Sequence, residues 1–380
     1  MKKNQISIPE EASWEDQDAY AYWLTRRYNV RCQTKERLLA CAGSPKDVYN
    51  MKEQHLEKLN FLTQREKEIL IRSAKEQPER LYECFRKEGG NFTCIGRRDY
   101  PGRLKPLKDR PFGFFYYGTL PADEAPAVGI VGARGCSDYG RAAAGSFADA
   151  IARAGAVVVS GMACGIDRTA GEAALDAGGT SCAVLGCGID ICYPESSFSL
   201  YWRLRREGCV LSEYPPGTAP LARHFPARNR IISALSDKLL VIEARKKSGS
   251  LITADMALEQ GRDVFAVPGR ISDPLSRGCN ELIRQGAGVA LSPQSLLLDM
   301  GIFSSENINK CKKNENSLAK EEKLLYSCVD LRPLSLEELT EKSGLSVSET
   351  MELLLNLQLK GYISEASRNH YVRTALDAGE

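Results

Sequence analysis

The chain of 380 residues has only three histidines, and none of its thirteen cysteines is spaced as a CxxC pair. Structural zinc sites normally use such paired ligands, so the sequence gives no indication of a metal site, and no cofactor is expected either. We expect the cysteines to be small, mostly buried apolar residues of a protein that resides in a reducing compartment.

Net charge and long apolar runs are also missing. Lys and Arg total 51 against 49 Asp and Glu, a formal net charge of +2. Bulk charge therefore does not indicate a nucleic-acid partner, and any anion site must be built locally. No window approaches the ~20 apolar residues of a membrane-spanning helix, and the N-terminal MKKNQISIPEEASWED is unlike a signal peptide. The chain is expected to be cytoplasmic, without membrane association.

Changes in composition along the chain predict four regions. Residues 1–90 carry apolar residues at helical spacing and should form a small helical domain. In residues 91–303, short apolar runs alternate with amphipathic helices, which predicts an α/β fold with a parallel sheet covered on both faces. Residues 304–322 are polar and charged and are read as a linker. Residues 323–380 give helix, turn, helix and hairpin, the outline of a winged helix.

Four predicted strand-to-helix junctions are rich in glycine and small polar residues: 131–140, 160–167, 185–194 and 244–254. Parallel crossovers are right-handed, so these loops should meet at the carboxyl edge of the sheet. Glycine lets the backbone approach a ligand closely, and each following helix directs free amide groups at the same place. Together the four loops predict an anion-binding crevice.

The loops match no common nucleotide motif. The glycines of VGARGCSDYG do not fit GxGxxG, and GxxxxGK[ST] and GxSxG are absent. His224 is the only histidine of the α/β region, and we interpret it as a packing or surface residue. No nucleophile–base pair is evident, so no catalytic residue is assigned. The crevice is expected to bind a ligand rather than to cleave one.

Residues 224–244, HFPARNRIISALSDKLLVIEA, place two arginines just before an apolar strand. We interpret FPARNR as a loop that leads into a short helix, so that Arg228 and Arg230 point toward the crevice. Guanidinium groups bind phosphate oxygens in a bidentate manner, which predicts a polyanionic ligand. The other cations expected on the rim are Arg134, Arg141, Lys246 and Lys247.

In this order, the motifs resemble the DprA/Smf family of DNA-processing proteins. The similar stretches, within about residues 94–290, are YPGRLKPLKDRPFGFFYYGTL, VGARGCSDYG, SGMACGID, AVLGCGIDICYP, FPARNRIISALSDKLLVIEA, SGSLITADMALEQGRDVFAVPG and GCNELIRQGA. The resemblance implies an extended Rossmann-like core between a SAM-like helical domain and a winged-helix domain. It also implies a homodimer of natural transformation that binds and protects incoming single-stranded DNA and loads the RecA recombinase onto it.

The resemblance also implies a set of binding residues. The family's phosphate-binding positions correspond to Gly132, Arg134, Ser160, Gly161, Gly165, Asp167, Arg228, Asn229, Ser248, Gly249, Ser250 and Thr253. Arg230, Lys246 and Lys247 extend the cationic path, and Phe225, Tyr139 and Tyr193 are candidate base-stacking platforms. The chain departs from the family pattern at Ala133, which replaces a serine, near Gly171, where a histidine is common, and after Tyr193-Pro194, where an asparagine is common.

Two alternatives remain open. The first is a nucleotide-processing hydrolase, similar to phosphoribohydrolases, with Asp167, Glu213 or Glu243 as general acid or base. Glu243 is instead expected to form a salt bridge with the adjacent basic loop. The second is a nucleotide sensor. Base release from nucleoside monophosphates indicates the hydrolase, and tight binding of mononucleotides indicates the sensor.

Two further regions of the sequence lead to expectations about partners. Apolar residues within 282–303 either form a dimer surface or pack inside the monomer. Residues 331–380 contain five Lys and Arg against eight Asp and Glu, and the candidate recognition helix has one cation, Lys360. Entry into a DNA groove needs the opposite sign of charge, so we expect the winged helix to contact protein or to regulate.

Overall fold

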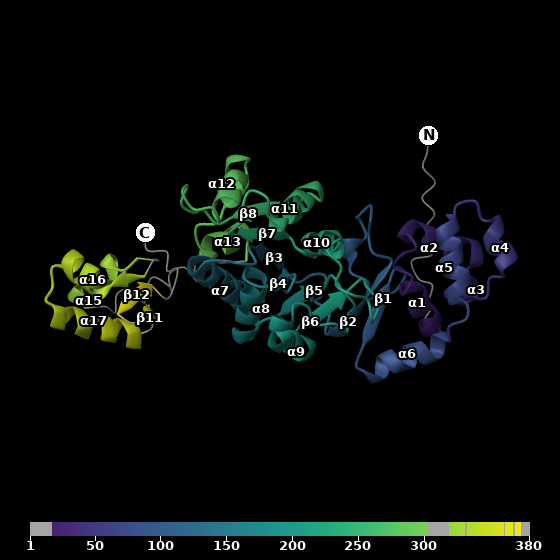
Figure 1. Ribbon diagram of the computed structural model, residues 1–380, viewed down its shortest axis with the longest axis horizontal. Coiled ribbons are helices and arrows are strands. Elements are labelled where there is room, and N and C mark those ends of the chain that lie inside the picture. The colour runs from purple at the N-terminus through teal and green to yellow at the C-terminus, as the bar shows by residue number, and fades with distance from the viewer. Residues whose placement is uncertain (1–16, 303–318, 331–332, 361, 368, 374–380) are drawn as a thin grey trace.

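The computed structural model describes residues 17–302, 319–330, 333–360, 362–367 and 369–373 (Figure 1). The N-terminal stretch and residues 304–318 of the predicted linker lie outside these ranges. No helix in the described ranges combines the length and the hydropathy that a membrane crossing requires.

From residue 17 onward, six helices at one end of the molecule precede the sheet (Figure 1). They are α1 Asp18–Thr25, α2 Cys32–Ala42, α3 Pro45–Tyr49, α4 Glu53–Lys58, α5 Gln64–Ser73 and α6 Pro78–Lys87. The ring of Tyr22 on α1 is fully buried and lies 5.2 Å from Phe85 and 5.5 Å from both Phe92 and Phe115, ring centre to ring centre. Because Phe92 and Phe115 belong to the sheet, the helices and this edge of the sheet share one apolar core.

A nine-stranded sheet forms the centre of the protein, in the order β1-β2-β6-β5-β4-β3-β7-β8-β9. Its strands are β1 Asn91–Cys94, β2 Gly113–Gly118, β3 Ala127–Gly132, β4 Val157–Ser160, β5 Ser181–Val184, β6 Cys209–Ser212, β7 Lys238–Ile242, β8 Asp263–Ala266 and β9 Gly288–Val289. β3 to β9 pair in parallel, whereas β1, β2 and β6 pair antiparallel at one edge. The predicted parallel, Rossmann-like sheet is therefore confirmed, and an antiparallel pair extends it.

Helices cover both faces of the sheet, because alternate strand residues point to opposite sides. Val128 and Ile130 of β3 pack in the cluster that includes α7 and α8, whereas Val131 packs with α10 and α11. The helices of this region are α7 Asp138–Arg153, α8 Ile166–Asp176, α9 Phe198–Glu207, α10 His224–Leu235, α11 Gly249–Glu259, α12 Arg277–Arg284 and α13 Pro293–Asp299.

The strand order reverses between β3 and β7. From β3 the chain builds outward through β4, β5 and β6, and it then returns to the other side of β3 with β7, β8 and β9. Crossovers on the two sides of such a switch point leave in opposite directions, which opens a crevice at the carboxyl ends of the strands. The loops after β3 and β7 flank that crevice.

The stretch FPARNR is helical and not a loop, which corrects the interpretation from sequence. α10 runs from His224 to Leu235 and includes it. Pro226 falls in the first helical turn, where the missing amide hydrogen has no helical acceptor, so proline is tolerated there. Arg228 and Arg230 are consequently about 200° apart around one helix and point in different directions.

The C-terminal unit has the predicted winged-helix order. Its elements are α15 Lys320–Cys328, β10 Leu334–Ser335, α16 Leu336–Ser343, α17 Val347–Leu359, β11 Ile363–Ser367 and β12 His370–Arg373. Leu325, Leu339, Leu354 and Ile363 form its core. Residues 320–322, which the sequence placed in the linker, belong to α15.

The recognition-type helix α17 carries little positive charge. Its exposed face includes Val347, Met351, Leu355 and Leu359, one turn apart. Lys360, just after the helix, forms an ion pair with Glu322 at 2.7 Å. These observations agree with the expectation from charge that α17 does not enter a DNA groove, and the expected contact with protein remains a prediction.

Candidate nucleic-acid interface

A crevice of about 480 Å³ lies at the carboxyl edge of the sheet. Its walls come from the loops after β3, β4, β5 and β7 and from the first turns of α10. The predicted residues that line it are Gly132, Arg134, Asp167, Tyr193, Phe225, Arg228, Asn229, Ser248, Gly249, Ser250 and Thr253. The separate glycine-rich loops therefore meet at one place, the switch point between β3 and β7.

Arg228 is the most deeply placed cation of the crevice, with an exposed fraction of 5%. Its Nη1 donates to the backbone oxygen of Gly161 at 3.0 Å, and its Nε donates to Asn229 Oδ1 at 3.2 Å. Burial lowers the pKa of Arg228 to about 10, while the nearby Asp167 opposes that shift. A guanidinium held in this way is charged at neutral pH and already oriented, so an arriving phosphate does not have to order it.

Gly161 makes room for this arrangement. A Cβ atom at this position would lie 2.7 Å from Arg228 Nη2 and 2.8 Å from Asp167 Oδ2. Both distances are shorter than real contacts allow, so any larger residue would displace one of the two charged groups. The Gly161 amide also donates to Asp167 Oδ2 at 3.2 Å. Gly161 does not itself line the crevice, but it sets the position of Arg228 within it.

Asp167 is the carboxylate of the crevice. It lies in the first turn of α8 and is 8% exposed. Burial raises its pKa to about 6, and the charge of Arg228 together with backbone amides opposes the shift. Asp167 thus holds the loop after β4 through the Gly161 amide, and it partly balances Arg228 when no anion is bound.

An aromatic surface lies beside the two arginines. The guanidinium carbons of Arg134 and Arg228 are 5.7 and 6.0 Å from the ring centre of Phe225. The half-exposed Tyr193 ring lies 5.4 Å from Phe225. Sequence reasoning missed Gly186, at which a Cβ would come within 2.8 Å of the Phe225 ring. The sequence feature that could have identified Gly186 is its position in the third glycine-rich loop, residues 185–194.

Two glycines bring the loops of the crevice together. Gly165 precedes α8 with a φ of +79°, and a Cβ there would lie 2.4 Å from the backbone oxygen of Ala133. A Cβ at Gly132 would lie 1.9 Å from the backbone oxygen of Ile242. These residues allow close approach between loops, and Gly132 also lines the crevice.

The start of α11 forms the opposite wall. Ser248 is the N-cap residue, and its hydroxyl accepts from the Ser250 amide at 3.4 Å. Gly249 has open space at its Cα, and Thr253 lies one turn further along the helix. The positive end of the helix dipole therefore faces the crevice, which favours an anion there.

Besides Gly161 and Gly165, which lie behind the lining, three predicted site residues have side chains that point away from the crevice. The Ser160 hydroxyl donates to the backbone oxygen of Ile130 at 2.8 Å and is buried inside the sheet. Tyr139 packs behind β3, and its hydroxyl donates to the Pro268 oxygen at 3.2 Å. Arg230 points to the other side of α10, where it pairs with Glu213 at 2.8 Å. The expectation that these three side chains face the crevice is therefore wrong.

Lys246 and Lys247 lie next to the crevice rather than in it. Both are exposed and line a neighbouring hollow of about 460 Å³, together with Asp255 and Glu281. The two hollows share Ser248 and Gly249, among other residues. These lysines are therefore placed to extend a cationic path beyond α11.

The three carboxylates that the hydrolase alternative would use, Asp167, Glu213 and Glu243, lie in different parts of the structure. Glu243 is 3% exposed and accepts from the amide and the hydroxyl of Ser137, so it holds the start of α7. The expected salt bridge to the basic loop is therefore wrong. Glu213 pairs with Arg230 outside the crevice. Of the three candidates, Asp167 alone lines the crevice. Among the described residues, no three His, Cys, Asp or Glu side chains gather as metal ligands would.

The fold defines the class: a Rossmann-like α/β protein with a crevice at the switch point of its sheet and a winged-helix domain after it. Residues 91–301 match the family model described as DNA recombination-mediator protein A, and residues 312–367 match the DprA winged helix domain. The chain belongs to the DprA/Smf family of DNA-processing proteins.

The most similar relatives include DNA processing protein DprA of Streptococcus pneumoniae, 45% identical over 215 residues, which are 56% of this chain and 76% of that protein. Protein Smf of Escherichia coli is 38% identical over 72% of this chain and 75% of its own length. Among solved structures, S. pneumoniae DprA has a TM-score of 0.64 at 35% identity, covering 74% of this chain and 97% of that one. The structure of Helicobacter pylori DNA processing protein A, whose description concerns its single-stranded DNA binding mode, has a TM-score of 0.51 at 30% identity. The match covers 55% of this chain and 95% of that one.

Asp167→Asn is expected to change how stability depends on pH. The folded pKa of about 6 lies above the ordinary value of 3.8, so the fold disfavours the charged form. The contribution of Asp167 to the free energy of unfolding of wild type should therefore fall as pH rises from 3.8 to about 6. The asparagine of the variant does not titrate, so the variant should not show this fall. The free energy of unfolding of the variant relative to wild type should rise by up to about 3 kcal/mol.

Urea unfolding at a series of pH values between about 4 and 7.5 measures this difference. Asp255→Asn, at an exposed position on α11, is the matched control and should show a nearly constant difference from wild type. A pH-independent difference for Asp167→Asn would contradict the proposed environment of the carboxylate.

Proposed function

We propose that this protein binds single-stranded DNA in the crevice between β3 and β7, protects it, and helps load the RecA recombinase onto it, without catalysing a reaction. The observation that carries the proposal is the buried, pre-oriented Arg228 guanidinium at the point where the glycine-rich loops meet. The H. pylori relative is described as binding single-stranded DNA, which supports single-stranded DNA as the ligand of this chain as well.

The composition of the crevice suits a single strand. Arg134 and Arg228 supply charge for successive phosphates, and the start of α11 adds the positive end of a helix dipole. Phe225 and Tyr193 offer ring faces beside these cations, as sequence-tolerant binding of unpaired bases requires. A duplex hides its base faces, so it would leave this aromatic surface unused.

Binding without bond cleavage is supported by the roles of the crevice groups. Asp167, the one carboxylate candidate in the crevice, accepts from the Gly161 amide and lies beside Arg228, which favours a positioning role. His224 is buried against the Tyr214 ring, with ring centres 4.1 Å apart, and is a packing residue. The alternatives are a phosphoribohydrolase-like enzyme and a nucleotide sensor that uses the same crevice.

Arg228→Ala and Arg134→Ala are expected to weaken oligothymidylate binding at least about tenfold each, because each removes a charge-assisted bond to phosphate. The slope of log affinity against log salt should fall by about 0.7 for each phosphate that is no longer neutralised. Fluorescence anisotropy across a salt series measures both quantities. Arg153→Ala, which removes an exposed cation at the far end of α7, is the control and should bind as wild type does.

RecA assembly on oligonucleotides coated with single-stranded-DNA-binding protein provides a second readout, which wild type should accelerate and Arg228→Ala should not. Unchanged DNA affinity in both folded arginine variants would contradict the proposed site. Release of free base from nucleoside monophosphates would indicate the hydrolase, and tighter binding of mononucleotides than of oligonucleotides would indicate the sensor.

We also propose that the protein forms a homodimer through the edge of the sheet at β9 and α13. Within the predicted stretch 282–303, Leu282, Leu296 and Leu297 are buried inside the monomer. Val289, Leu291 and Leu298 are exposed by 40%, 72% and 46%, beside an edge strand. Exposed apolar groups gathered at an edge favour contact with a second copy.

The double substitution Leu291→Glu and Leu298→Glu is expected to convert the dimer to a monomer, because paired carboxylates would be buried in the interface. Light scattering with size-exclusion chromatography measures the mass. Leu359→Glu, at another exposed leucine, on α17, should leave the mass unchanged. A monomeric wild type, or a double variant that stays dimeric, would contradict this interface.

A further inference from the structure

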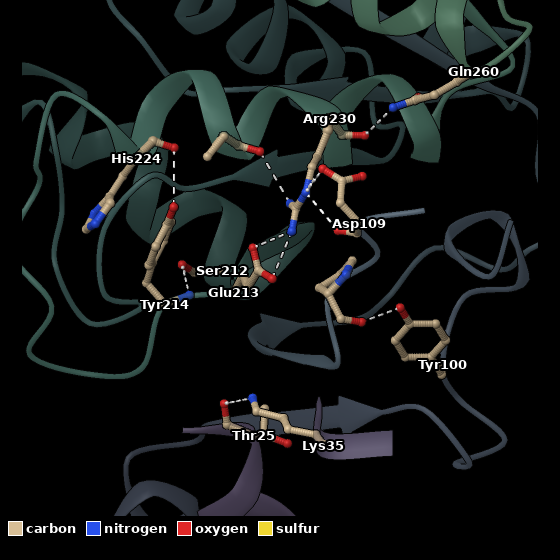
Figure 2. Close-up of polar contacts among 12 residues, drawn as sticks. Thr25, Lys35, Tyr100, Asp109, Ser212, Glu213, Tyr214, His224, Arg230 and Gln260 are labelled. Atoms are coloured by element: carbon tan, nitrogen blue, oxygen red, sulfur yellow. Dashed lines mark hydrogen bonds and ion pairs between the residues drawn. The ribbon is translucent and has the colours of Figure 1, made fainter. Parts of the chain in front are cut away.

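A second hollow of about 330 Å³ lies between the helical domain and the sheet, on the side of α10 that carries Arg230 (Figure 2). Its walls come from the end of α1 through the start of α2, from residues 108–113 at the start of β2, from Glu213 after β6 and from Arg230 of α10. The apolar core that joins α1 to β1 and β2 holds these segments together. The hollow shares no lining residue with the DNA crevice.

Lys35 of α2 lines this hollow and is 2% exposed. Its Nζ lies 3.5 Å from the Thr25 backbone oxygen, a long contact (Figure 2). The same atom lies 4.9 Å from the centre of the Phe112 ring. No ion pair involves Lys35 within the described part of the chain. A buried ammonium with so few acceptors is unfavourable unless something else balances its charge.

The neighbouring cations already have acidic partners. Arg31 pairs with Glu66, Arg110 pairs with Glu36, and Arg230 pairs with both Asp109 and Glu213. Figure 2 shows the Arg230 guanidinium held between those last two carboxylates. Among the described residues, Lys35 and the exposed Lys108 are the lining cations that form no ion pair with a carboxylate.

We propose that this hollow binds a small phosphate monoester the size of a nucleoside monophosphate, with its phosphate between Lys35 and Lys108. A dianion would give the buried ammonium the acceptors that the protein does not supply. The volume is that of a small-molecule site, and Tyr28 and Phe112 add aromatic wall for the rest of the ligand. The site stands apart from the proposed DNA crevice and from its function.

The protonation of Lys35 gives the site a pH dependence. Burial lowers the pKa of Lys35 to about 8; Cys32, Glu213 and Cys94 oppose this shift, and Arg27 adds to it. Lys35 is therefore charged below about pH 8 and neutral above it. A phosphate monoester remains a dianion across this range, because its second pKa is about 6. Its affinity should therefore fall as pH rises from about 7 to 9.5.

Isothermal titration calorimetry of the full chain with deoxyadenosine monophosphate tests the proposal, with inorganic phosphate and deoxyadenosine as separate arms. The monophosphate should bind, phosphate should bind more weakly, and the nucleoside should not bind. Lys35→Met should weaken the monophosphate at least about tenfold and Lys108→Ala about threefold. Arg228→Ala should bind the probe as wild type does, which separates this site from the crevice.

Binding that is unchanged in Lys35→Met, or that is lost in Arg228→Ala instead, would overturn the proposal. Thermal unfolding shows whether Lys35→Met folds, which is expected because the change removes a buried charge while keeping an unbranched side chain. If it does not fold, the wild-type pH series decides: a fall in affinity of about tenfold above pH 8 supports the site, and a flat profile overturns it.

Discussion

The site depends on how the Arg228 guanidinium is kept charged inside the protein. Burial disfavours the charge, and the Gly161 carbonyl, the Asn229 amide oxygen and the nearby Asp167 carboxylate offset that penalty. The arrangement exists only because Gly161 has no Cβ, which would overlap both charged groups. The absence of a side chain at Gly161 therefore allows the Arg228 guanidinium to keep one orientation at the base of the crevice.

The topology explains why this cation meets the other donors. β3 and β7 are neighbours in the sheet, although more than a hundred residues separate them in the chain. Their loops and the starts of α8 and α11 converge at the switch point, and α10 crosses it with Arg228 on the inner side. On its outer side α10 carries Arg230, which faces a different hollow between the domains (Figure 2). One helix thus separates the two proposed anion sites.

The sequence predicted the fold class and the convergence of the glycine-rich loops, because strand–helix alternation and glycine spacing are local patterns. It did not predict side-chain direction. FPARNR was interpreted as a loop, so the helical phase that separates Arg228 from Arg230 was missed. Ser160 and Glu243 bond to partners distant in the chain, Ile130 and Ser137, which no spacing reveals. The hollow lined by Lys35 could not be predicted from the sequence for the same reason, because its walls come from four segments that are distant in the chain.

The central claim is that Gly161 acts on DNA binding through Arg228, and a double-mutant cycle tests it most directly. Oligothymidylate affinity is measured for wild type, Gly161→Ala, Arg228→Ala and the double variant, each shown to be folded. We predict that Gly161→Ala weakens binding about tenfold in wild type and less than about twofold when Arg228 is already absent. Equal losses in both backgrounds would show that the two residues act independently, and would contradict the claim.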